Sequence, residues 1–144
     1  RGLVGSEMCI RDRISSTINE AKEYNELKEW ALCLDNKLQE TQKILFHLIP
    51  FATKGDYERF LADASVFMEF FSLVLVGWSW LEIGVASKRS VITGDKSHET
   101  DFFESKLDTL EYFYAYELPK TSGLSEVILH PSSITIKTDK KTIS

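Results

Sequence analysis

The segment from Tyr57 to Ala86 most constrains the fold, because it is long, strongly apolar and bounded by polar residues. Its first half has one apolar stripe at helical spacing, and from Val66 onward nearly the whole circumference is apolar. Trp78 and Trp80 are two residues apart, so they point about 200° apart on an α-helix. A helix with an indole on both sides must be covered on both sides. The segment is therefore predicted to be the central helix of a bundle, or a helix between a small bundle and a larger body.

The residues before this segment predict one long helix and a short loop. Ser15–Ile49 contains an apolar seam with a period of about 3.5 residues, which predicts a single helix. Pro50 is expected to end it, because proline lacks a backbone N–H and restricts the preceding residue. A loop with Gly55 follows, and Asp56 is the predicted N-cap of a helix over about Tyr57–Ser87.

Two more helices are predicted after the central one. Lys88–Ser97 is a polar loop, and Asp101 with Glu104 resembles a capping box that begins a third helix. Pro119 is expected to end this helix. A short fourth helix is predicted over Ser122–Leu129, with Ser122 as its cap.

The expected fold class is all-α: an antiparallel bundle of three long helices and a short fourth, over residues 14–129. Residues 130–144 are rich in Ser, Thr and Lys and are predicted to form a mobile tail. Ile134–Lys137 could extend as a strand, but a lone strand would have no partner.

The first thirteen residues, RGLVGSEMCIRDR, have no helical or strand periodicity. Their last part, GSEMCIRDR, resembles a translated sequencing-adaptor tail. Residues 1–13 are therefore predicted to be a non-native leader, with the native protein beginning near Ile14. The alternative is an ordinary disordered terminus.

Composition excludes some functions and favours a compartment. A net charge of −5 without a Lys/Arg stripe argues against nucleic acid as a partner. Cys9 and Cys33 have no metal-ligand spacing, and two unrelated thiols indicate a reducing compartment, so a cytoplasmic location is expected. The apolar run between Glu69 and Glu82 has 12 residues. A membrane span needs about 20, so no span is predicted.

The sequence contains no recognisable catalytic, cofactor-binding or metal-binding motif, and none is predicted. His47, His98 and His130 are far apart and have no second ligand at helical spacing. Glu69 and Glu82 lie within the most apolar segment, where a carboxylate can act as an acid or base. The favoured interpretation is that each faces a groove or a Lys of a neighbouring helix.

Two other groups have a simple structural interpretation. Cys33 lies between two leucines and is interpreted as a small helix residue, with no cation or helix N-terminus to activate it. An aromatic cluster could stack on a base or a flavin ring, but at helical spacing it is interpreted as core. The cluster consists of Tyr112, Phe113, Tyr114 and Tyr116.

Two stretches resemble the extra C-terminal helical domain of acyl-CoA dehydrogenases of the methylmercaptopropionyl-CoA dehydrogenase type. The first is Asp63–Ser87, with Trp78-x-Trp80-Leu81 as its characteristic part. The second is Phe102–Pro119, where the matching positions are Phe102, Phe103, Lys106, Leu107, Tyr112, Phe113, Leu118 and Pro119. The chain departs from the family pattern at Ser72, Leu73, Leu110 and Glu111.

The resemblance implies a truncated, non-catalytic accessory domain of an FAD-dependent enzyme that α,β-dehydrogenates acyl-CoA thioesters. In that family the flavin site, the acyl-CoA pocket and the catalytic glutamate precede this domain, so no site residue is assigned here. The implied partners are the missing catalytic domains and further subunits of a homo-oligomer. The alternatives are a free-standing helical protein-interaction module and, third, a membrane-associated helical protein.

Overall fold

The computed structural model describes residues 2–94 and 97–130, and side chains outside 2–8 and 97–100. This part of the chain is helical and contains no strand, which confirms the all-α prediction. The elements, in order, are α1 (Gly2–Ala21), α2 (Lys28–Thr53), α3 (Tyr57–Thr93), α4 (Ser97–Tyr112), the π-helix η1 (Phe113–Glu117) and α5 (Lys120–Leu129).

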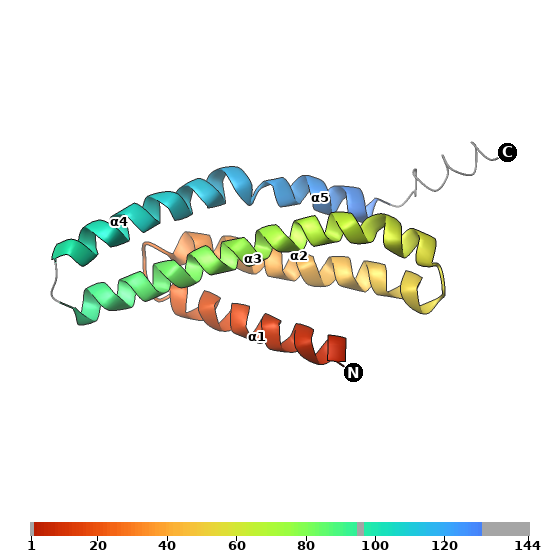
Figure 1. Cartoon of the computed structure of the whole chain (residues 1–144), viewed down its shortest axis with the longest axis horizontal. Helices are drawn as coiled ribbons and strands as arrows, with labels where there is room; N and C mark the ends of the chain where they lie inside the picture. The colour runs from red at the N-terminus through yellow and green to blue at the C-terminus, as the bar shows by residue number, and fades with distance from the viewer. Residues whose placement is uncertain (1, 95–96, 131–144) are drawn as a thin grey trace.

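Helix α3 is the centre of the bundle. It runs antiparallel to α2, and α1 packs against one side of this pair (Figure 1). The chain then reverses, and α4, η1 and α5 follow one another back along α3 (Figure 1). Because α3 contacts every other described α-helix, it has the central position that its apolar sequence predicts.

One continuous apolar core joins these helices. Phe70, Val74 and Leu81 of α3 are fully buried, as is Leu34 of α2. The other buried apolar residues of the cluster are Ile14, Ile18, Ala21, Leu27, Ala31, Leu38, Ile44, Leu48, Val85, Leu110, Phe113, Tyr114, Leu118 and Ile128.

The predicted single helix over Ser15–Ile49 is wrong, because residues 22–27 form a turn that separates α1 from α2. The reversal buries Ile14 and Ile18 in the core. It also brings Lys22 Nζ to 3.5 Å from Asp35 Oδ2. On one continuous helix, these residues would be roughly 20 Å apart. An apolar seam with a 3.5-residue period fits one long helix and also two helices joined by a turn, since α1 and α2 both bury their part of the seam.

The leader is helical in the structure, although its sequence predicted no regular element. Helix α1 begins at Gly2 and continues without a break to Ala21. Within α1, Ile10 packs against the core one turn before Ile14. The non-native origin of residues 1–13 stays a prediction.

The loop between α2 and α3 is close to its prediction. Pro50 lies inside the last turn of α2, which ends at Thr53, so the prediction that it stops the helix at Ile49 is wrong by one turn. Gly55 has a φ of 82°, a conformation that glycine adopts readily. Asp56 caps α3 as predicted, because its side chain accepts a hydrogen bond from the Arg59 N–H at 3.4 Å.

The later boundaries differ from their predictions. Helix α3 extends to Thr93, and α4 begins at Ser97, so Asp101 lies within the helix and does not cap it. Pro119, not Ser122, occupies the N-cap position of α5. Proline suits a helix start because its φ is already helical and no N–H is required there. The predicted tail beyond residue 130 lies outside the described residues.

Candidate functional site

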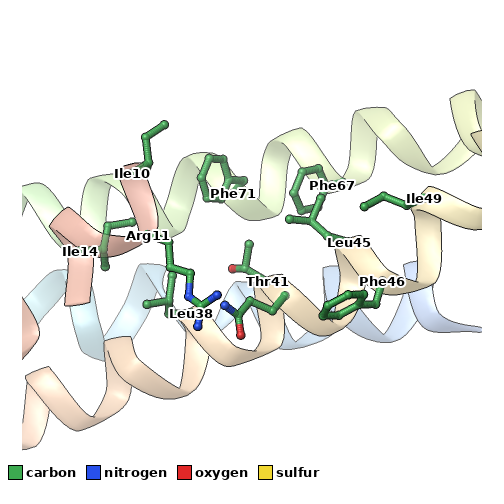
Figure 2. Close-up of a pocket in the computed structure, with 11 residues that line it drawn as sticks. Ile10, Arg11, Ile14, Leu38, Thr41, Leu45, Phe46, Ile49, Phe67 and Phe71 are labelled. Carbon is green, nitrogen blue, oxygen red and sulfur yellow. The ribbon is translucent and has the colours of Figure 1, made fainter. Parts of the chain in front are cut away.

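An apolar groove lies where α1, α2 and α3 meet. Its volume is about 540 Å³. Ile10, Arg11 and Ile14 of α1 close one end, and Phe67 and Phe71 of α3 form one wall (Figure 2). The opposite wall comes from α2: Leu38, Thr41, Gln42, Leu45, Phe46 and Ile49. We call this cavity the α1–α3 groove.

Polar groups in the α1–α3 groove are confined to one place. The Arg11 guanidinium lies beside the Gln42 amide, and with its oxygen turned toward Arg11 the amide accepts from Nε at 2.6 Å. In the aromatic wall, the rings of Phe67 and Phe71 stack on each other, with 5.8 Å between the ring centroids. Phe46 is 78% exposed and forms the open rim. This surface suits an apolar side chain of a partner, and its lining offers no nucleophile or acid–base pair.

Neither candidate carboxylate lies in the groove. Glu69 and Glu82 are both exposed on α3. Glu82 Oε1 lies 3.5 Å from the Thr17 hydroxyl of α1, so its neighbour is a hydroxyl and not the predicted lysine. An exposed carboxylate lacks the apolar surroundings that acid–base catalysis at neutral pH requires.

The aromatic cluster is divided between the core and the surface. The π-helix buries Phe113 and Tyr114, in agreement with the core interpretation. Tyr112 and Tyr116 are exposed, at 57% and 65%, and their rings are 5.0 Å apart. The core interpretation is therefore wrong for Tyr112 and Tyr116, which are four residues apart and share one exposed face of the helix.

The two tryptophans flank the core seam of α3, and both are half-buried. Trp78 faces α1: its Nε1 donates to Thr17 Oγ1 at 2.9 Å, and the Arg13 guanidinium lies 5.3 Å from its ring centroid. Trp80 lies on the opposite flank of the same helix. That flank faces α4, because nearby Ser87 shares a hollow with Phe102 of α4.

The cysteines have no activating environment. Cys9 is exposed. Cys33 is half-buried, and desolvation raises the pKa of its thiol, an effect that nearby Lys37 opposes. A raised thiol pKa lowers the fraction of reactive thiolate at neutral pH. The structural interpretation of Cys33 therefore fits its surroundings.

The described residues contain no group of three or more His, Cys, Asp and Glu side chains placed to hold a metal ion. His47 packs edge-on against Phe51, with ring centroids 5.5 Å apart. In this part of the chain, α3 alone is long and apolar enough to cross a membrane by length and composition. A mostly buried core helix of a soluble protein passes the same test, and 17% of the most apolar window of α3 is buried.

A known family matches most of the chain. The family model described as acetyl-CoA dehydrogenase C-terminal like matches residues 10–139. The chain belongs to this family. No curated protein and no solved structure matches it.

Membership of the acetyl-CoA dehydrogenase C-terminal-like family confirms the coarser part of the resemblance in the sequence. The match begins at residue 10, within the leader, and includes all helices from α2 to α5. The α1–α3 groove and the π-helix therefore lie within the family domain. Sequence reasoning found neither, because the groove joins three distant segments and the π-helix has no periodic signal.

Proposed function

We propose that this chain is the C-terminal accessory domain of an FAD-dependent acyl-CoA dehydrogenase of the methylmercaptopropionyl-CoA dehydrogenase type. Such an enzyme removes two hydrogens from the α and β carbons of an acyl-CoA thioester, and FAD accepts the hydride. The family match over residues 10–139 is the observation that supports the proposal most strongly. The role proposed for the domain is to pack on the catalytic body or at a subunit interface of a homo-oligomer.

The N-termini of α2 and α3 do not fit the pyrophosphate of FAD. A dinucleotide pyrophosphate binds at helix N-termini with free N–H groups. The N-terminus of α3 is occupied by Asp56, which accepts from Arg59 N–H, and has Glu58 in its first turn. Helix α2 likewise has Glu29 in its first turn. These carboxylates would repel a phosphate, so flavin chemistry is assigned to the missing domains.

The α1–α3 groove is the surface proposed to receive the catalytic body. It is apolar, and Phe46 and Ile49 on its rim are 78% and 45% exposed. Large exposed apolar groups that line a hollow are typical of protein–protein contacts. A free-standing interaction module would use the same groove, and this is the alternative function.

One experiment separates these functions. The native gene is sequenced upstream of the codon for Ile14, and the resulting full-length protein is expressed. Several hundred in-frame codons of an acyl-CoA dehydrogenase are expected, with flavin bound to the product. A start codon close to Ile14 would favour the interaction module. As a second arm, the present chain is titrated with FAD and an acyl-CoA. Saturable flavin binding by this chain would contradict the proposal.

The groove is tested by two matched substitutions on α2 in the full-length enzyme. Phe46→Ser removes a rim side chain, and Leu32→Ser removes an apolar side chain that is also exposed but does not line the groove. Phe46→Ser is expected to increase protease cleavage between domain and body, while Leu32→Ser is not. Equal cleavage of both variants would place the docking surface elsewhere.

A further inference from the structure

The outward face of α3 is a second uncovered surface, distinct from the α1–α3 groove. From Leu61 to Ser90 the residues on this face follow steps of three and four, which form one straight stripe on an α-helix. Four of them are large and apolar, and their exposed fractions are between 38% and 65%: Leu61, Met68, Val76 and Ile83. We call this face the outer stripe; it is roughly 44 Å long.

The outer stripe contains no charged residue. Between its large residues are small ones at intervals of seven, all exposed: Ser65, Ser72, Ser79 and Ala86. Small side chains allow a second helix to approach closely. Only 17% of the residues in the most apolar window of α3 are buried, so this domain leaves much of the helix uncovered.

The two ends of the outer stripe differ in shape. At the N-terminal end, Tyr57 and Leu61 project with exposed fractions of 63% and 65%. At the C-terminal end, α3 and α4 enclose a hollow of about 280 Å³. The hollow is lined by Ile83, Ala86, Ser87, Ser90 and Phe102. The stripe therefore has a projecting end and a receiving end.

If a second copy of α3 lies antiparallel to the first, the projecting end of each copy meets the receiving end of the other. A twofold axis between Ser72 and Ser79 places each of these serines opposite the other one in the partner. The same register places Leu61 of one copy opposite Ser90 of the other, at the edge of the hollow. It also places Met68 opposite Ile83. The same register places Val76 of each copy at the axis, with the small serines on either side of it, and farther out the large residues meet the hollow or another apolar residue.

Charge favours a second copy over a lipid surface. In a twofold interface like charges approach near the axis, and a stripe without charge avoids this repulsion. Membrane-surface helices instead combine an apolar face with flanking Lys and Arg that bind anionic lipid. The outer stripe offers no such cation, and the net charge of the chain is −5.

We propose that the outer stripe is a self-association surface on which a second copy of this chain packs antiparallel about a twofold axis between Ser72 and Ser79. This specifies the subunit-interface role within the proposed function. It requires no flavin and no catalytic body, so it is tested on the present chain alone.

The test is sedimentation equilibrium of the 144-residue chain over a range of concentrations. The apparent mass is expected to rise from 16.5 kDa to twice that value. Ser79→Glu places a carboxylate near the axis, and it is expected to weaken the dimer at least tenfold. Ser105→Glu, the same change on an exposed position of α4, is the matched control and is expected to leave the dimer intact. Circular dichroism verifies that each variant is folded.

A second measurement avoids added charge. In a background of Cys9→Ser and Cys33→Ser, Val76→Cys places a thiol beside the axis, and a short bismaleimide is expected to cross-link it into dimers. The products are separated on a denaturing gel. Thr109→Cys on α4 is the control, and this variant should run as a monomer. A wild-type mass of one chain at every concentration would overturn the proposal. So would equal behaviour of the Ser79 and Ser105 variants, or equal cross-linking of the two thiols. None of these three outcomes affects the test of the upstream gene.

Discussion

The Tyr114 hydroxyl donates a hydrogen bond to the backbone carbonyl of Gly77, with 2.8 Å between the two oxygens. This bond joins η1 to the middle of α3 inside the core, where Tyr114 is 6% exposed. Burial raises the pKa of Tyr114 well above its ordinary value, so its hydroxyl remains a neutral donor at physiological pH. A Cβ at Gly77 would lie 3.5 Å from the phenolic oxygen, an ordinary contact, and 3.3 Å from Phe113 Cε1, a tight one, so the close packing here is against the Phe113 ring.

The first prediction concerns this hydrogen bond. Tyr114→Phe removes the donor and keeps the ring, so the free energy of unfolding should fall by about 1 kcal/mol. The midpoint of thermal unfolding should fall by roughly 3 °C. Tyr116→Phe is the matched control, since that side chain is 65% exposed and should cost almost nothing. Equal midpoints for the two variants would mean that the buried bond adds no net stability.

The central helix was predictable because its signals are local. Gly55 and Asp56 mark its start, and the long apolar segment that follows leaves no alternative to a covered helix. The observed α3 begins at the predicted Tyr57 and extends one to two turns beyond the predicted Ser87. The end is less precise because the residues after Ser87 are polar but still helix-compatible.

The hairpin between α1 and α2 was not predictable from the seam. Tyr24 and Leu27 continue the apolar spacing through the turn, so periodicity gives no sign of a break. The turn is held by contacts such as the Leu27 N–H to the Tyr24 carbonyl at 3.0 Å, and by burial of Leu27. Such tertiary burial decides where a weakly marked helix ends. The α1–α3 groove depends on this reversal and was therefore not predictable from the sequence pattern.

The second prediction compares two helical glycines. A Cβ on Gly84 would lie 3.1 Å from methyl carbons of both Leu27 and Leu110, which are themselves fully buried. Crowding of about 1–3 kcal/mol should exceed the helix-propensity gain of about 1 kcal/mol, so Gly84→Ala should be destabilising. Gly123→Ala on α5 meets nothing within 4 Å and should stabilise by up to about 1 kcal/mol.

Urea unfolding of the two glycine variants and the wild-type chain measures this difference. The signs should be opposite. A stabilised Gly84→Ala variant would show that the leucine methyls move aside without cost and that the α3–α4 contact is looser than described.

The third prediction concerns the contact between Trp78 and Thr17. Trp78→Phe and Thr17→Val each remove one partner of the bond between α3 and α1. A double-mutant cycle should give a coupling of about 1 kcal/mol, since the bond is partly buried and between neutral groups. Trp80→Phe is the matched control: the same change on the other flank should show no coupling to Thr17→Val. Equal coupling for both tryptophans would mean that α1 does not contact α3 through Trp78.

The fourth prediction is a pH dependence at Asp63. Desolvation raises the pKa of this carboxyl above its ordinary value of 3.8, and the charges of His47 and Arg59 only partly oppose the shift. Because the folded state binds the proton more tightly, this contribution to stability is fully present below pH 3.8 and is lost as the pH rises through the folded pKa.

The Asp63→Asn variant cannot ionise at this position. At pH 7 its free energy of unfolding should therefore exceed that of the wild type, by less than about 1 kcal/mol for this partly solvated group. The advantage should disappear below pH 3.8. Urea unfolding at several pH values measures it, with Asp108→Asn on the exposed face of α4 as control. A variant less stable than wild type at pH 7 would show that attraction to His47 and Arg59 outweighs desolvation at this site.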